Sequence, residues 1–282
     1  MRNRWRRFSS NLVVALCGAA VVLALIPLAL ILFYVVTQGI TSLNVAFFTQ
    51  MPRPVGEAGG GMGNAIIGSL MVTGLGALLA IPIGVISGIY AAEYSGTRFA
   101  ALTRFAADTL NGVPSIVVGV FVYGMVVLPF RQFSALAGGV ALGIMMIPLI
   151  MRTTEELLRL VPPTLREGAL ALGATRARAV FTVVVPAALP GIITGILLAL
   201  SRIAGETAPL LFTSFNNRFW STDPTQPIST LTVQVYTYAI SPYADWHRQA
   251  WAGALVLVTI VLSCSLLARL ATARMERLQR GG

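Results

Sequence analysis

Long runs of uncharged apolar residues recur along this 282-residue chain and limit what it can fold into. The first run, residues 12–36, contains no charged residue and exceeds the roughly 20 residues that a helix needs to cross a bilayer. It is also longer than the apolar region of a signal peptide, so we expect it to remain as a span. A chain that is 56% hydrophobic and only 11% charged belongs in a membrane rather than among soluble folds. We therefore predict an all-α integral membrane domain.

Six membrane spans are predicted from these runs and from the charge and turn signals between them. Their residue ranges are 12–36, 62–92, 109–129, 133–151, 186–212 and 249–270. The transmembrane domain then covers 12–270, with short terminal segments at 1–11 and 271–282. Between spans lie an inner loop, 152–185, and a polar outer segment, 213–248. Pro148 is expected to break the fourth span.

Arginine supplies all of the positive charge, because the sequence contains no lysine. Fifteen arginines fall in segments that would share one side of the membrane with both termini, and four fall in the opposite segments. The first group is Arg2, Arg4, Arg6, Arg7, Arg98, Arg104, Arg152, Arg159, Arg166, Arg176, Arg178, Arg269, Arg274, Arg277 and Arg280, and the second is Arg53, Arg131, Arg218 and Arg248. Because arginine is enriched in cytoplasmic loops, both termini are predicted to be cytoplasmic. These arginines cluster beside apolar runs, which is the pattern of membrane topology signals and argues against a nucleic acid partner.

Arg202 and Glu206 are left inside the predicted fifth span. Spaced four residues apart on a helix, they would share a face. A charge at the bilayer centre costs roughly 2.5 to 3.5 kcal/mol even on the lenient insertion scale, so both should face protein or water. Two interpretations follow. The residues form an ion pair that locks helices together, or they line an anion path in which the guanidinium binds an oxyanion and the carboxylate prevents too tight a hold.

The loop between the fourth and fifth spans contains a short predicted helix. The pair Pro162–Pro163 should end the preceding helix, and Thr164 with Glu167 has the spacing of a capping box. Residues 168–172 are small or apolar but far too few to cross a bilayer. Gly173 should end the helix in a left-handed conformation. Such an apolar stub in a charged loop either docks onto a partner surface or lies on lipid headgroups.

Composition excludes several chemistries. Without lysine the chain cannot provide the P-loop GxxxxGK[ST], so it cannot be an ATPase. Cys17 and Cys264 lie in separate apolar runs, and with a single histidine they predict neither a metal site nor a disulfide framework. His247 follows Asp245 closely, but no GxSxG elbow accompanies them, so a solvated histidine is expected. We predict a non-catalytic chain that binds no cofactor itself.

Residues 164–186 resemble the EAA loop of ABC importer permeases. The matching residues are Glu167, Gly168, Ala169, Gly173, Val183, Val185 and Pro186. Gly168 replaces the middle alanine of the family pattern, and two valines replace isoleucine and leucine. In that family the segment is the coupling helix that docks into a groove on the ATP-binding subunit. The resemblance implies this contact for Glu167, Gly168, Ala169, Leu170 and Gly173.

Two other stretches resemble the phosphate ABC importer permeases of the PstA type. They are ADTLNGVPSIVVG at 107–119 and SRIAGETAPLLFT at 201–213. The resemblance covers most of residues 63–270 and implies a type I ABC importer permease fold in a bacterial inner membrane. It also implies a phosphate path lined by Arg202, Glu206, Asn111 and Ser115.

The resemblance further implies a set of partners. These are a homologous permease of the PstC type, two ATP-binding subunits of the PstB type and an external phosphate-binding protein of the PstS type, with ATP hydrolysed on the ATP-binding subunits. Candidate hinges for ATP-driven alternating access are Gly84, Gly88, Pro114 and Pro148, with close packing or a static kink as the alternative. A permease for sulfate or molybdate should lack the GETAPL block, and a secondary anion transporter should show inverted repeats.

Overall fold

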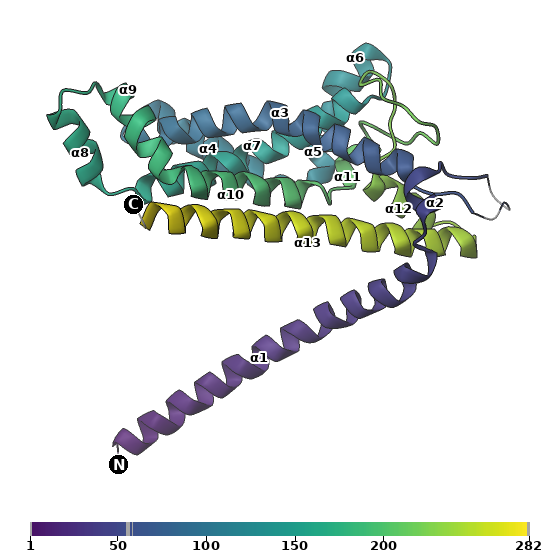
Figure 1. Ribbon diagram of the computed structural model, residues 1–282, viewed down its shortest axis with the longest axis horizontal. Helices are drawn as coiled ribbons and strands as arrows, with labels where there is room; N and C mark the ends of the chain where they lie inside the picture. Colours follow the sequence, from purple (N-terminus) through teal and green to yellow (C-terminus); the bar gives the residue numbers. More distant parts are fainter. Residues whose placement is uncertain (1, 55–56, 58, 281–282) are drawn as a thin grey trace.

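The computed structural model describes residues 2–54, 57 and 59–280, and every regular element in that part is helical (Figure 1). Five helical stretches are long and apolar enough to cross a membrane. They are α1 (Arg2–Gly39), α3 (Gly63–Glu93), α7 (Ala135–Leu160), α13 (Ala244–Arg280) and the continuous run Arg176–Ile203, which joins α9 (Arg176–Ala179), the π-helical turn η3 (Val180–Val184) and α10 (Val185–Ile203). The predicted all-α membrane fold is confirmed.

A sharply bent pair of helices supplies the sixth apolar segment. Helix α4 (Arg98–Gly112) is followed by the run Ser115–Phe130, which comprises α5 (Ser115–Val122), η2 (Tyr123–Val127) and α6 (Leu128–Phe130), and the two meet at 104°. Pro114 causes the break, because it lacks an N–H and forces the preceding residue out of the helical conformation. The predicted third span, 109–129, therefore starts in the last turn of α4 and crosses this break, and its remainder coincides with the run Ser115–Phe130.

Helices α3 and α7 pack along each other and form the centre of the bundle. Small residues allow the close approach. A Cβ atom on Gly84 would lie 2.8 Å from Cβ of Ile150, and one on Gly88 would lie 2.6 Å from the carbonyl oxygen of Met151. These contacts support close packing over hinge motion at both glycines. Helix α7 continues through Pro148, so the predicted break there is wrong; proline is tolerated in membrane helices that pack on neighbours.

The last two predicted spans have different limits in the structure. Helix α10 ends at Ile203 and a separate α11 (Ala208–Leu211) follows a turn, so the span predicted at 186–212 is not one helix. The outer segment, 213–248, contains the largely buried α12 (Leu231–Ala239), and α13 begins at Ala244 instead of residue 249. The sequence predicted an exposed polar segment here because α12 contains polar residues. One of them, Gln234, is in fact buried and accepts a hydrogen bond from the Ser229 hydroxyl at 3.0 Å.

Helix α1 diverges from the bundle, and the C-terminal end of α1 meets α13 (Figure 1). There the Tyr34 and Trp251 rings are 5.0 Å apart, and a Cβ on Gly39 would lie 2.7 Å from the Trp251 carbonyl oxygen. The far end of α1 and the end of α13 lie on the same side of the molecule as α8 (Pro163–Ala171), while α2 (Val45–Thr49) and α12 lie at the opposite end.

Close contact between α5 and α11 leads to a prediction about Gly119. A Cβ atom on Gly119 would lie 2.6 Å from Cα of Pro209, which is backbone and cannot rotate away. We expect Gly119→Ala to separate these helices and to cost about 1–3 kcal/mol, the usual range for overpacking. Thermal unfolding of the purified protein should show a lower midpoint. Gly124→Ala is the matched control, because nothing lies within 4 Å of its added Cβ. Equal midpoints for the two variants would contradict the close packing.

Candidate anion path and coupling helix

The four residues predicted for the substrate path line a single cavity of about 150 Å³. Asn111 comes from the end of α4, Ser115 from the start of α5, Arg202 from the last turn of α10, and Glu206 from the turn that follows. The other lining residues are Leu110, Val113, Met145, Leu149 and Ile203. Since a water molecule takes up about 30 Å³ of liquid, the cavity has room for a small hydrated anion.

The bend between α4 and α5 brings Asn111 and Ser115 to one wall of this cavity. Pro114 stands at the N-cap of α5, and Ser115 is the first residue of that helix. The first N–H groups of a helix have no partner within it and carry a partial positive charge, so the start of α5 favours an anion. The cavity lining therefore combines a hydroxyl, an amide and a helix N-terminus with the side chain of Arg202.

Arg202 and Glu206 share the cavity but not a helix face. The prediction that they share a face of one helix is wrong, because α10 ends at Ile203 and Glu206 lies in the turn beyond it. That turn is fixed by the Thr232 hydroxyl, which donates to the Glu206 carbonyl oxygen at 2.9 Å. No ion pair within 4.0 Å joins Arg202 to Glu206, both of which are described residues. The ion-pair lock considered from the sequence is absent between these two side chains.

Helix α8 forms the predicted short helix of the inner loop, with nine residues and none of them buried. It begins at Pro163, with Pro162 at the N-cap, so the predicted capping box is wrong: Thr164 lies inside the first turn. Proline at the first helical position starts the helix instead, because its fixed φ suits that position. Gly173 has φ +84°, which confirms the predicted left-handed end, and the Ala174 N–H donates to the Ala169 carbonyl at 3.1 Å.

An apolar surface is exposed on and beside α8. Leu170 is 45% exposed and Leu172 is 91% exposed. An open depression of about 520 Å³ runs between α8 and the start of the following helix, with Gly168, Ala169 and Gly173 in its lining. Glu167 is also exposed on α8. The five residues predicted to contact an ATP-binding subunit thus lie together on a projecting, uncovered element.

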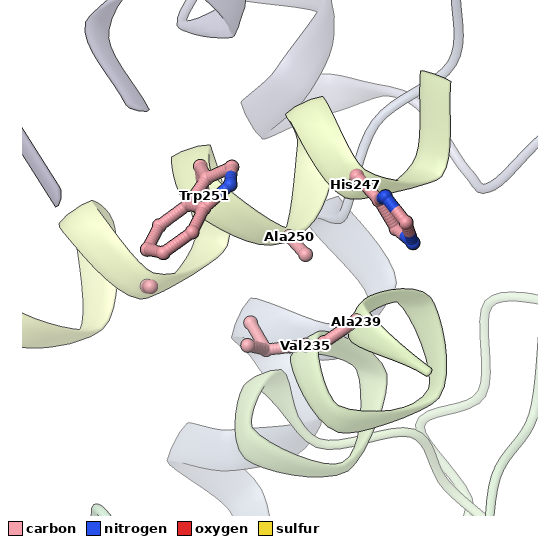
Figure 2. A pocket seen from close by; sticks show the side chains of 6 residues that line it. Val235, Ala239, His247, Ala250 and Trp251 are labelled. Atoms are coloured by element: carbon pink, nitrogen blue, oxygen red, sulfur yellow. The ribbon is translucent and has the colours of Figure 1, made fainter. Parts of the chain in front are cut away.

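A second hollow, of about 210 Å³, lies between α12 and α13 (Figure 2). Its lining is apolar apart from His247, whose Nε2 is 2.5 Å from the Ser241 carbonyl oxygen. Asp245 pairs with Arg248 and not with this histidine. The lining of this hollow contains no arginine, unlike that of the cavity at Arg202.

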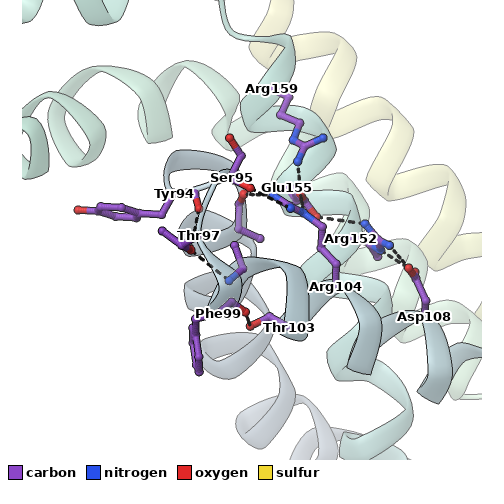
Figure 3. Close-up of polar contacts among 12 residues, drawn as sticks. Tyr94, Ser95, Thr97, Phe99, Thr103, Arg104, Asp108, Arg152, Glu155 and Arg159 are labelled. Carbon is purple, nitrogen blue, oxygen red and sulfur yellow. Dashed lines mark hydrogen bonds and ion pairs between the residues drawn. The ribbon is translucent and has the colours of Figure 1, made fainter.

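Sequence reasoning missed a charge network around Glu155, whose side chain is 2% exposed on α7 (Figure 3). Three guanidinium groups donate to it, those of Arg104 at 2.5 Å, Arg159 at 2.6 Å and Arg152 at 3.3 Å. Arg152 also pairs with Asp108 on α4. Because Arg104 and Asp108 belong to α4, the network fastens α4 to α7.

The network adjoins the anion cavity on the side that faces α8. Asp108 precedes the cavity residue Asn111 by about one helical turn, and Arg152 follows the cavity residue Leu149 by about one turn. The prediction overlooked it because the fourth span was ended at residue 151, which placed its members in loops. Its signal in the sequence was Arg152, Glu155 and Arg159 at helical spacing.

Comparison with known proteins identifies the family. Residues 80–280 match the family described as binding-protein-dependent transport system inner membrane component. The phosphate transport system permease protein PstA of Yersinia pestis is 46% identical over 274 residues, covering 97% of this chain and 93% of that protein. This chain belongs to the PstA family. Among other PstA proteins, that of Haemophilus influenzae is 44% identical over 271 residues, covering 96% of each chain. A probable PstA of Methanocaldococcus jannaschii is 37% identical over 259 residues, covering 92% of each chain.

Solved structures share the fold of this PstA-family chain. A chain of a bacterial alginate ABC transporter, in complex with an alginate pentasaccharide-bound periplasmic protein, superposes with a TM-score of 0.67 at 14% identity, covering 94% of both chains. A chain of the inward-facing MetNI methionine ABC transporter gives a TM-score of 0.59 at 19% identity, covering 76% of this chain and 94% of that one. The predicted type I ABC importer permease fold is confirmed, and the chain is a multi-pass membrane transport component.

Proposed function

We propose that this chain is the permease subunit of an ATP-driven importer of inorganic phosphate and that Arg202 is its main anion-binding group. The observation that carries the proposal is the cavity at the α4–α5 bend, where Asn111, Ser115 and Arg202 converge. Arg202 lines this cavity and has no ion-pair partner among the described residues. A guanidinium binds phosphate oxygens bidentately, and this geometry suits a site that is open to an incoming anion.

Partners supply the energy and the substrate. In line with the resemblance of residues 164–186 to the EAA loop, α8 docks onto an ATP-binding subunit of the PstB type, where ATP is bound and hydrolysed. A PstC-type permease completes the path. A PstS-type protein delivers phosphate from outside. Both termini face the cytoplasm, because the far ends of α1 and α13 lie on the α8 side, where most arginines gather. Membrane lipids surround the membrane-spanning helices within residues 12–270, in the bacterial inner membrane.

Alternating access would use the bend at Pro114. ATP binding closes the ATP-binding subunits, the movement reaches the bundle through α8, and the cavity turns outward to receive phosphate. Hydrolysis returns the cavity to the inside. Helix α4 can change its angle to α5 at Pro114, because residues 113 and 114 lie outside both helices.

Uptake into reconstituted vesicles tests the function. We expect the chain, assembled with its three kinds of partner, to take up radiolabelled phosphate only with ATP and only when the ATP-binding subunits are present. Uptake without those subunits would indicate a secondary transporter. Uptake of sulfate or molybdate in place of phosphate would assign a different oxyanion.

Glu206 is proposed to discriminate phosphate from sulfate. Phosphate at neutral pH still carries a hydroxyl that can donate to a carboxylate, whereas sulfate offers only acceptors. Hydrogen bonds to charged groups contribute about 1.5–3 kcal/mol, so Glu206→Gln should raise sulfate inhibition of phosphate uptake by about 10- to 150-fold. Glu156→Gln, at an exposed position on α7, is the control. Unchanged exclusion of sulfate by Glu206→Gln would move selection to the external binding protein.

A further inference from the structure

Helix α8 stands away from the bundle (Figure 1). The side chain of Arg166 attaches it to the ends of α3 and α7. The helix is joined to α7 by a short link at Val161–Pro162 and to the next helix by residues 172–175. A projecting helix on two such links would tilt when pushed, without moving the bundle. The side chain of Arg166 contacts residues at the ends of neighbouring helices, and only 25% of it is exposed.

Arg166 makes four hydrogen bonds to two other helices. Its Nε and Nη2 donate to Oε1 of Glu93 at 3.1 and 2.9 Å, its Nη1 donates to the Val161 carbonyl at 2.9 Å, and its Nη2 also donates to the Leu158 carbonyl at 2.8 Å. Four of the five N–H donors of a guanidinium group are involved. The Glu93 side chain is 7% exposed, so the ion pair is shielded from water on the carboxylate side.

These partners are the ends of the two central helices. Glu93 is the last residue of α3, and Leu158 and Val161 lie in and just beyond the last turn of α7. The last carbonyl groups of a helix have no partner within it and carry a partial negative charge, which a cation stabilises. Arg166 therefore closes the C-terminal end of α7, neutralises the carboxylate at the end of α3 and holds α8 to both.

From the ends of α3 and α7 the attachment continues toward the anion cavity. Arg104 of α4 donates to the Ala91 carbonyl of α3 at 2.5 Å as well as to Glu155 of α7. Arg152 then pairs with Asp108, about one turn from the cavity residues of α4 (Figure 3). Each step is a charged contact between different helices, so a displacement of α8 that carries α3 and α7 with it also carries α4.

We propose that Arg166 is a positioning residue for energy coupling, which makes α8 move as one body with the α3–α7 pair. The inference rests on the proposed function, since it takes α8 to be the element pushed by an ATP-binding subunit. Other arginines of the loop are placed differently: Arg176 lies over the Tyr94 ring, with its guanidinium carbon 5.5 Å from the ring centroid. The linkage through Arg166 determines how much of each ATP-driven movement reaches the cavity.

The test compares phosphate uptake with ATP hydrolysis in vesicles that hold the full complex. For Arg166→Gln we expect normal basal ATP hydrolysis and at least a tenfold lower ratio of phosphate transported to ATP hydrolysed. Arg176→Gln, which removes the same charge from the same loop, should keep the wild-type ratio within twofold. A wild-type ratio for Arg166→Gln would overturn the proposal.

Two further variants keep the proposal testable if Arg166→Gln does not assemble. Arg166→Lys retains the charge but cannot span Glu93 and both carbonyls, so its ratio should lie between those of wild type and Arg166→Gln. Glu93→Gln removes the ion pair and leaves the carbonyl contacts, and it should also lower the ratio. Wild-type ratios for both would overturn the proposal. If the wild-type complex shows no ATP-dependent phosphate uptake, the proposed function is contradicted and not the role of Arg166. The role of Arg166 would then be tested by the ratio of the anion that is transported to ATP hydrolysed.

Discussion

Arg202→Gln is expected to abolish ATP-dependent phosphate uptake while the complex still assembles. The substitution removes the positive charge and the two-pronged donor from the cavity but keeps a side chain of similar length. Each hydrogen bond lost to the anion costs about 1.5–3 kcal/mol, which is about 10- to 150-fold in rate, so the loss of both donors should leave no measurable uptake. Initial rates in vesicles measure the effect, with co-purification of the ATP-binding subunits as the check on assembly.

Two comparisons separate a role in the anion path from a role in packing. Arg202→Lys keeps the charge without the planar fork, and its uptake should be intermediate. Arg98→Gln removes one charge from an exposed position at the start of α4 and should transport normally. Normal uptake by Arg202→Gln would exclude Arg202 from the path.

Glu155→Gln should cause the largest loss of stability. The buried carboxylate holds Arg104 and Arg152, which are 19% and 29% exposed, and Arg159 is half exposed and adds little. Removing one partner of a buried ion pair typically costs about 3–5 kcal/mol, because the remaining charges lose their compensation. For a chain of this size we expect the thermal unfolding midpoint to fall by about 10 °C.

Glu156→Gln provides the matched control for Glu155→Gln. The two glutamates are neighbours on α7, but Glu156 is exposed and Glu155 is buried. Its unfolding midpoint should stay within about 1–2 °C of wild type, as expected for a surface substitution. Equal midpoints for both variants would show that the network around Glu155 does not hold α4 to α7.

The spans that are apolar throughout could be predicted from the sequence. The predicted first span, 12–36, lies within α1, and the second, 62–92, agrees closely with α3. Gly173 ends α8 in the left-handed conformation as expected. Helix α12 could not be predicted, because its polar residues suggest a loop until the burial of Gln234 is known. The helix break after Ile203 was predictable, since Gly205 and Pro209 are both helix breakers.

The candidate site was predictable only in part. Arg202 and Glu206 stand out as charges in an apolar run, and Asn111 and Ser115 followed from the family resemblance. Their convergence depends on the 104° bend between α4 and α5, whose angle no local pattern specifies. The contact of Arg166 with Glu93 joins residues 73 positions apart, so only the packing of α3 against α7 could reveal it.

Thiol labelling of the cavity tests most directly whether phosphate passes Arg202. Met145→Cys places a thiol in the cavity wall of a chain whose native Cys17 and Cys264 have been changed to serine. Ile240→Cys, exposed at the end of α12, is the control. We predict that saturating phosphate slows labelling of Met145→Cys in the transporting complex by tenfold or more and leaves Ile240→Cys unchanged. Equal labelling of Met145→Cys with and without phosphate, in a complex that still takes phosphate up, would contradict an anion path through this cavity.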